Sequence, residues 1–273
     1  MNAKMWMSAA RKKAWVEDLL TKRDAIERAV GMPLGRMLGC GHWGCVFEGE
    51  PPWVVKLSID PTEGPIWMKI LNLVGEERYG DGGFPEIRLI RRIMPDLVTG
   101  GRKRKVWAIV REGIEPVFVH DRKGLRFSQY TLDKLGLPVD APAYGPRAQY
   151  GDFSRAIEGL DRYRLAAQAW HRRKRGEDTS AWGFPSLEWT EEYITRLDRH
   201  FSGAAFAPLG ESLSMLASNG VYLRDVHKLN IGWHVARDAD DWDRIVIFDP
   251  GHTPTAGGKD IEQVLVENGR EAL

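Results

Sequence analysis

Residues 221–232 read VYLRDVHKLNIG, and this stretch indicates the fold more strongly than any other part of the chain. Within it, Asp225 is followed five residues later by Asn230, in a turn between apolar segments. Residues 246–251 read VIFDPG, an apolar strand that ends at Asp249. Phosphoryl transfer needs a carboxylate that orients an attacking hydroxyl, and hard oxygen ligands for Mg²⁺. The spacing of these three residues therefore suits phosphoryl transfer.

A Gly-rich stretch earlier in the chain points to the same chemistry. Residues 38–47 read LGCGHWGCVF and fit the pattern G-x-G-x-x-G-x-V, with its glycines at Gly39, Gly41 and Gly44. Glycines allow a backbone to approach phosphate groups closely. Residues 53–56 then form a short apolar strand that ends in Lys56, whose ammonium group would neutralise phosphate charge.

Taken in this order, the motifs resemble those of the protein-kinase superfamily. The resemblance implies an α+β, bilobal fold with an antiparallel-sheet N-lobe and a shortened, mainly helical C-lobe. We expect an accessory helix in residues 1–30, the N-lobe with the Gly-rich loop and hinge in 31–114, and the C-lobe in 115–273. Only residues 252–273 follow the last motif. The chain therefore resembles compact atypical kinases of the phage or bacterial type.

The resemblance also implies an ATP site. The three glycines would shape the loop that covers the ATP phosphates, and Lys56 would contact those phosphates. Main-chain groups of Glu112 and Gly113, in the expected hinge, would meet the edge of the adenine.

The resemblance further assigns roles to the three polar residues near the C-terminus. Asp225 would orient the acceptor hydroxyl, and Asn230 and Asp249 would coordinate Mg²⁺. ATP and Mg²⁺ are therefore the expected cofactors of an ATP-dependent kinase.

The carboxylate that holds Lys56 has three candidates. Residues 60–63 read DPTE, the pattern of a helix start, and Glu63 shares a face with the apolar residues that follow at 3–4 spacing. Glu63 is favoured because it lies close to Lys56 in sequence. Glu76 and Glu77 stand nearer the spacing that is usual in protein kinases and remain alternatives.

The acceptor stays open between two chemical classes. His227 makes the motif D-x-H-x-x-N, which is similar to that of aminoglycoside and choline phosphotransferases, whereas Ser/Thr kinases usually have lysine there. Leu223 replaces the usual histidine, and Pro250 replaces the phenylalanine of D-F-G. A protein serine or threonine is favoured over a small hydroxylated molecule. A nucleotide-binding pseudokinase that acts as a scaffold is the further alternative.

Composition narrows the setting of the protein. The 273 residues carry a net charge of +1, which suggests neither nucleic acid nor a membrane as an obligatory partner. The expected location is the cytoplasm.

The two cysteines, Cys40 and Cys45, would lie across the Gly-rich hairpin from each other. Reduced thiols are expected there, and a redox-sensitive pair that stiffens the loop is the alternative.

Hydrophobic periodicity predicts the remaining elements. Helices are expected over 8–30, 153–175, 187–201 and 208–219, with Gly220 ending the last of them. Paired strands are expected over 88–94 and 106–111, joined by a basic turn over 99–105. The pattern places no element firmly between residues 116 and 150.

Overall fold

The computed structural model describes most of the chain, and its architecture is mixed α+β. The described residues are 17–41, 43–74, 82–99, 102–121, 124–139, 141, 147–178, 186, 189–190, 192–193, 196–197, 200–201, 203–237 and 242–250. They form an antiparallel sheet of five strands, two smaller antiparallel sheets and several helices. The α+β class is confirmed. No helix among these residues is long and apolar enough to cross a membrane.

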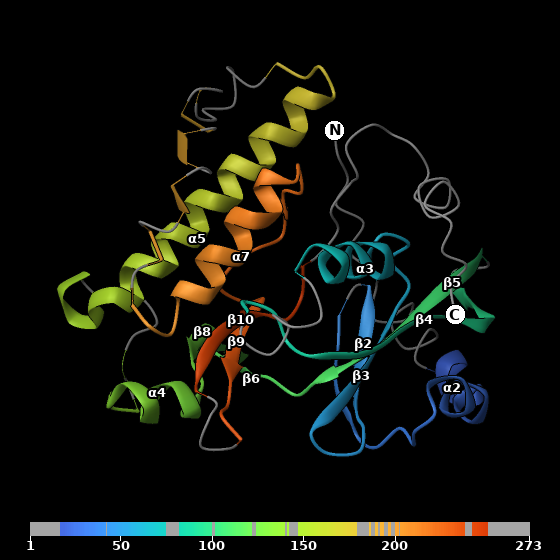
Figure 1. Ribbon diagram of the computed structural model, residues 1–273. Coiled ribbons are helices and arrows are strands. Elements are labelled where there is room, and N and C mark those ends of the chain that lie inside the picture. The colour runs from blue at the N-terminus through green and yellow to red at the C-terminus, as the bar shows by residue number, and fades with distance from the viewer. Residues whose placement is uncertain are drawn as a thin grey trace. The chain divides into compact units, whose positions relative to one another are not determined.

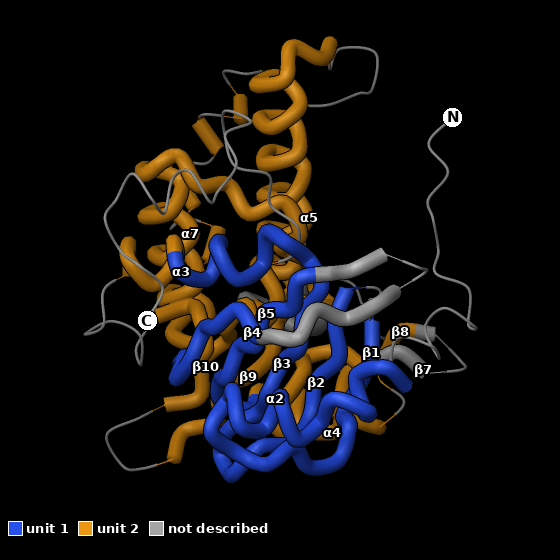
Figure 2. Tube along the Cα trace, turned by 90° about the vertical axis from the view of Figure 1, so that its right-hand side faces the viewer, with its two compact units in different colours: residues 1–68, 86–113, 272–273 blue, residues 69–85, 114–271 orange. Residues whose placement is uncertain are grey.

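The chain divides into two compact units (Figure 2). Of the described residues, those up to Met68 and those from Glu86 to Gly113 belong to the first unit. Those from Lys69 to Pro85 and those from Ile114 onward belong to the second. Helix α3, Glu63–Val74, contains one of the boundaries and so connects the two units covalently.

The first unit is built on the five-stranded sheet, whose order is β1-β2-β3-β5-β4. Its strands are β1 Met37–Cys40, β2 Gly44–Glu48, β3 Trp53–Ser58, β4 Ile87–Thr99 and β5 Arg102–Glu112. The predicted pairing of 88–94 with 106–111 is confirmed by the register Ile90↔Ile109. The basic turn predicted over 99–105 is wrong, because β4 and β5 continue to the pair Thr99↔Arg102. The ladder is held by main-chain hydrogen bonds, so a run of basic side chains does not end it.

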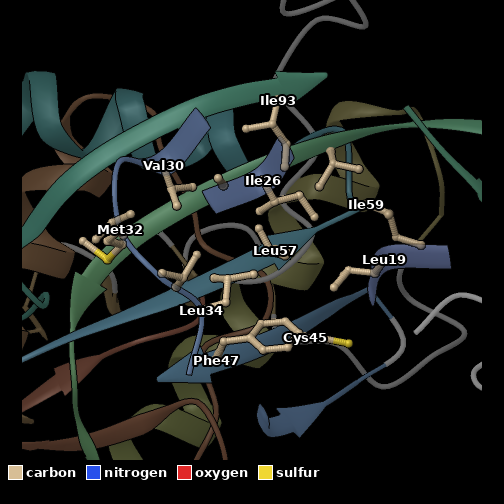
Figure 3. Close-up of a cluster of buried hydrophobic side chains, with 14 residues drawn as sticks. Leu19, Ile26, Val30, Met32, Leu34, Cys45, Phe47, Leu57, Ile59 and Ile93 are labelled. Carbon is tan, nitrogen blue, oxygen red and sulfur yellow. The ribbon is translucent and has the colours of Figure 1, made fainter. Parts of the chain in front are cut away.

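Successive side chains of a strand point to opposite faces of the sheet, and the two faces of this sheet differ in chemistry. Val55 and Leu57 of β3 belong to a hydrophobic cluster, in which Figure 3 shows Leu57. Lys56 between them points to the opposite face, because successive side chains of a strand alternate between its two faces. The cluster is covered by helix α2, Arg23–Val30, and by the segment before it. Burial of Leu19, Ile26 and Val30 confirms those positions of the predicted amphipathic helix.

The helix predicted over 8–30 is only partly within the described residues. Residues 17–21 are helical and a turn at Lys22 follows. Helix α2 then ends at Val30, and Gly31 after it has a φ of 74°. Residues 8–16 lie outside the described part of the chain.

Helix α3 begins at Glu63, the last residue of the DPTE stretch that indicates a helix start. The Asp60 carboxylate accepts hydrogen bonds from the Thr62 main-chain N–H, at 2.8 Å, and from its hydroxyl, at 2.7 Å. Pro65 is tolerated because an N–H in the first turn of a helix has no intrahelical partner. Gly64 packs against Trp107, since a Cβ there would lie 2.2 Å from the indole ring. The start of α3 is thereby held against β5.

Among its described residues, the second unit contains two small sheets and several helices (Figure 1). One sheet has the order β10-β9-β6, and β7 pairs with β8 in the other. The strands are β6 Glu115–Pro116, β7 Phe118–Asp121, β8 Gly124–Phe127, β9 Ile231–His234 and β10 Arg244–Ile247. The helices are α4 Gln129–Leu135, α5 Arg147–Lys174 and α7 Ala207–Ser218.

Two of the predicted helices in this unit are confirmed. Helix α5 covers the prediction over 153–175 to within one residue at its end and begins earlier. Helix α7 matches the prediction over 208–219, and Gly220 follows it with a φ of 70°. Over 187–201, residues 189–190 and 192–193 are helical among those that the structure describes.

Candidate functional site

The Gly-rich hairpin, residues 37–48, is formed by β1 and β2. The N–H of Gly41 donates a hydrogen bond of 2.7 Å to the carbonyl of Gly44, which closes the turn. A Cβ on Gly44 would lie 2.8 Å from the carbonyl oxygen of Leu57, so the hairpin could not approach β3 with a side chain there. A Cβ on Gly39 would meet nothing within 4 Å. The packing of the hairpin on β3 therefore requires glycine at position 44. At Gly39 the structure has room for a side chain, so the glycine leaves the backbone exposed to open space.

Lys56 lies behind this hairpin and forms an ion pair with Glu63. Its Nζ is 2.6 Å from Glu63 Oε1, and the two side chains are only 9% and 3% exposed. The Cε of Lys56 would be 3.4 Å from a Cβ on Gly44, which places the lysine stem directly beneath the hairpin. Of the three candidate partners, the structure brings Glu63 to the lysine, while Glu76 and Glu77 lie outside the described residues.

The pair follows from local structure. Lys56 points away from the α2 side of the sheet because its neighbours Val55 and Leu57 point toward it. Glu63 opens α3 only seven residues later, after the turn that Asp60 holds. A buried ion pair is costly to form, because both charged groups lose their hydration. If one of the two residues is removed, the other charge stays buried without compensation. The arrangement is therefore suited to holding an ammonium group at one fixed point.

The expected hinge differs from the prediction in its hydrogen bonds. The N–H of Glu112 donates to the carbonyl of Glu86, at 2.9 Å, and the N–H of Gly113 donates to the carbonyl of Pro52, at 2.8 Å. The Glu112 carboxylate is also engaged, since it accepts from the Glu86 N–H at 2.8 Å. These two main-chain N–H groups already have acceptors and are not available to an adenine edge in this structure.

Cys40 and Cys45 form a disulfide, which corrects the expectation of reduced thiols. The register of β1 and β2 places them directly opposite each other, with 4.1 Å between their Cα atoms. Cys45 points into the α2 side of the sheet, where it is fully buried beside Phe47 (Figure 3). The bond therefore joins the two strands of the Gly-rich hairpin on the face opposite Lys56.

In the second unit, the 221–230 turn connects α7 to β9 and holds Asp225 against His227. The Nε2 of His227 is 3.3 Å from Asp225 Oδ1, and the Leu229 N–H donates to His227 Nδ1 at 3.1 Å. Since Nδ1 accepts, the proton of a neutral ring is on Nε2, which donates to the carboxylate. This hydrogen bond is the largest of the effects that hold the pKa of Asp225 below its ordinary value.

Asn230 and Asp249 lie at the same end of the β9–β10 pair. Residue 247 pairs with residue 231, and the Phe248 N–H donates to the Asn230 carbonyl at 3.0 Å. The Asn230 amide nitrogen donates to the main-chain carbonyl of Asp225 at 2.8 Å, which leaves its Oδ1 as the acceptor of that side chain. An amide oxygen and a carboxylate are ligands that Mg²⁺ accepts.

These donors suit a metal that also binds phosphate and water. Among the described residues there is no cluster of three or more His, Cys, Asp or Glu side chains that could enclose an ion. Magnesium is commonly held by one or two protein carboxylates together with substrate phosphates, so Asn230 and Asp249 fit that group.

Two buried side chains of α5 hold the 221–230 turn, and sequence reasoning missed both. The Tyr163 hydroxyl accepts a hydrogen bond from the Leu223 N–H at 3.1 Å. The Nε2 of His171 is 2.7 Å from the Tyr222 carbonyl. Burial lowers the pKa of His171 to about 4, so the ring is neutral near pH 7 and donates this bond from Nε2. The available sequence signal is Leu223, whose apolar side chain cannot hydrogen-bond to the turn itself.

The candidate residues thus fall into two constellations, one in each unit. Lys56, Glu63 and Gly44 are in contact in the first unit, and Asp225, His227 and Asn230 are hydrogen-bonded in the second. No model of a known protein family matches the chain, and no curated protein matches it either.

Proposed function

We propose that this chain is an ATP-dependent phosphotransferase that moves the γ-phosphate of Mg-ATP to a hydroxyl group, with a protein serine or threonine as the favoured acceptor. The observation that carries the proposal is the buried Lys56–Glu63 pair directly beneath the Gly-rich hairpin. Bare glycine backbone and a fixed ammonium group together form a binding surface for phosphates.

A bilobal, protein-kinase-like fold with a shortened C-lobe is part of this proposal. Its support is the composition of the two units. The first has a five-stranded antiparallel sheet and the start of α3, and the second has α4, α5, α7 and the β9–β10 pair.

The chemistry assigned to the second unit is in-line displacement. The acceptor oxygen forms a bond to the γ-phosphorus, the bond from that phosphorus to the bridging oxygen breaks, and ADP leaves with the electron pair. The hydroxyl proton would pass to Asp225, whose Oδ1 is held by His227. Asn230 and Asp249 would hold Mg²⁺, which neutralises phosphate charge when bound. Because the Asp225 carboxyl is ionised near neutral pH, its main contribution is orientation of the hydroxyl.

One observation favours a small-molecule acceptor as the second candidate. The Nε2 of His227 donates its hydrogen bond to Asp225, within the D-x-H-x-x-N turn. A lysine at this position, as in Ser/Thr kinases, would place a positive charge beside the transferred phosphate instead.

The test uses γ-labelled ATP and Mg²⁺, with the purified protein alone and with cell lysate. Asp225→Asn and Lys56→Met remove one group from each unit. Asp133→Asn, an exposed aspartate that accepts from Gln129 on α4, is the matched control. We expect label on a protein band that both site variants lose and the control keeps.

The other results separate the alternatives. Label confined to small molecules would establish the second candidate. ATP binding without transfer, unaffected by Asp225→Asn, would establish a pseudokinase scaffold. Absence of both ATP binding and transfer in the unmodified protein would refute the proposal.

A further inference from the structure

One face of α5 lies along the 221–230 turn and is rich in arginine. His171 contacts the Tyr222 carbonyl, and the Trp170 ring packs on the Tyr222 ring with centroids 4.2 Å apart. Arg164 falls on the same face as His171, because residues seven apart align on a helix, and Arg175 follows Lys174, the last residue of α5. The C-terminal part of α5 is thereby held at Tyr222, two residues before Arg224.

The arginines near this turn form what we call the cationic face, made of Arg164, Arg172, Arg175 and Arg224. Arg172 and Arg175 share one carboxylate, Glu177, at 3.3 Å and 2.6 Å. Residues 172–178 read RRKRGED, so four cations stand against two carboxylates. The segment 172–178 therefore carries an excess of positive charge.

These guanidinium groups shift the pKa values of one another and of Asp225 in the candidate site. Burial first, and then Arg175 and Arg172, lower the pKa of Arg224 from its ordinary value. Arg164 contributes to the lowered pKa of Asp225, and its own nearest carboxylate, Asp161, is 3.9 Å away. The buried Nε of Arg164 donates no hydrogen bond within the described residues. Cations held this closely repel each other, and an added anion would relieve that repulsion.

We infer that the cationic face binds an anionic side chain of the acceptor, so that the substrate is a serine or threonine in an acidic or phosphorylated segment of a protein. This inference rests on the proposed function and specifies its acceptor. Clustered arginines recognise carboxylate and phosphate groups through paired N–H donors, which suits either anion. Polycationic acceptors such as aminoglycosides would be repelled from the same face.

The geometry sets the position of the anion relative to the hydroxyl. Arg164 acts at Asp225, where the hydroxyl would lie. Arg172 follows eight residues later on α5, and Arg175 lies one residue past the end of this helix. At roughly 1.5 Å per helical residue, the separation of Arg164 from Arg172 is about 12 Å. An extended peptide covers about 3.3 Å per residue, so the anion belongs about four residues from the acceptor hydroxyl.

The experiment compares serine peptides that differ only at those positions. One peptide carries aspartates, one carries phosphoserines, one carries asparagines and one carries lysines, and each is made with the substitutions before and after the serine. Binding is measured by fluorescence anisotropy and transfer by kcat/KM, at low and at moderate salt. The protein variants are Arg172→Ala/Arg175→Ala and the charge-preserving Arg172→Lys/Arg175→Lys. Arg162→Ala is the matched control, because Arg162 is also on α5 but pairs with Glu158.

We expect the aspartate and phosphoserine peptides to bind and react at least about fivefold better than the asparagine peptide, as two exposed charge pairs allow. The alanine variant should lose this preference, the lysine variant should keep most of it, and the control should match the unmodified protein. Added salt should reduce the preference. A larger gain with phosphoserine than with aspartate would identify a phosphorylated segment as the source of the anion.

Two results would overturn the inference. Because binding and transfer are measured separately, failure of the inference can be distinguished from failure of the proposed function. Equal binding and transfer for acidic and neutral peptides would refute the cationic face while leaving the kinase intact. Preference for the lysine peptide would do the same and would favour a cationic acceptor. Selective binding of acidic peptides that is lost in the alanine variant, without any transfer, would support the cationic face and count against the proposed function.

Discussion

Replacing Glu63 with leucine tests whether the buried ion pair serves stability or phosphate binding. In this variant the Lys56 ammonium loses the carboxylate that lies 2.6 Å from it, while its side chain remains about nine-tenths buried. Removing one partner of a buried pair costs about 3 kcal/mol, because the remaining charge stays out of water. The double variant Lys56→Met/Glu63→Leu replaces both charges with apolar groups of similar volume, and its stability should return to within about 1 kcal/mol of the unmodified protein.

The assay is urea unfolding followed by circular dichroism, together with ATP binding on the same samples. Glu48→Leu is the matched control, because Glu48 pairs with Arg36 at 2.7 Å on the surface, with exposed fractions of 41% and 77%. Its unfolding midpoint should not change measurably, since exposed pairs contribute little. ATP binding should be lost in the double variant although its stability is restored. A retained ATP affinity in the double variant would refute the phosphate role of Lys56, and an unchanged midpoint in Glu63→Leu would refute the energetic role of the pair.

Three further predictions concern the glycines and histidines of the site. Gly44→Ala should lower the unfolding midpoint and weaken ATP binding, because its Cβ would lie 2.8 Å from a carbonyl oxygen, whereas Gly39→Ala should fold normally and weaken only ATP binding. His171 has a pKa of about 4 against an ordinary value of 6.5, so the unfolded chain binds a proton that the native protein does not, and stability should fall by up to about 3 kcal/mol as pH drops through this window. His171→Gln should lessen that loss in urea titrations at pH 4 to 7, and an unchanged slope would show that His171 is not its source. Removing the hydrogen bond to Asp225 with His227→Leu should raise the pKa of that carboxyl, so the acidic limb of the kcat/KM profile should move to higher pH while the KM for ATP changes little.

Several features could be predicted from the sequence because they depend on neighbours along the chain. The periodicity of Leu19, Ile26 and Val30 marked a buried helix face, and the structure confirms it. Glu63 was favoured as the partner of Lys56 on sequence proximity, and a strand, a short turn and a helix start bring the two together. Asn230 and Asp249 lie at the ends of two short apolar strands that pair with each other.

Other features could not be predicted because they depend on main-chain groups that every residue possesses. The bonds that occupy the N–H groups of Glu112 and Gly113 go to carbonyl oxygens, which leave no trace in residue identity. The same is true of the extension of β4 and β5 through a basic stretch that was read as a turn.

Periodicity, turn residues and short-range spacing act over a few residues, so the sequence predicts the residue types of the site, their order and the elements that present them. Which distant groups support these residues depends on the tertiary fold. His171 and Tyr163 lie 51 and 60 residues before the main-chain groups that they hold, and both lie on α5. Such contacts arise from how a long helix docks as a whole, which is set by the sum of many buried surfaces rather than by a local pattern.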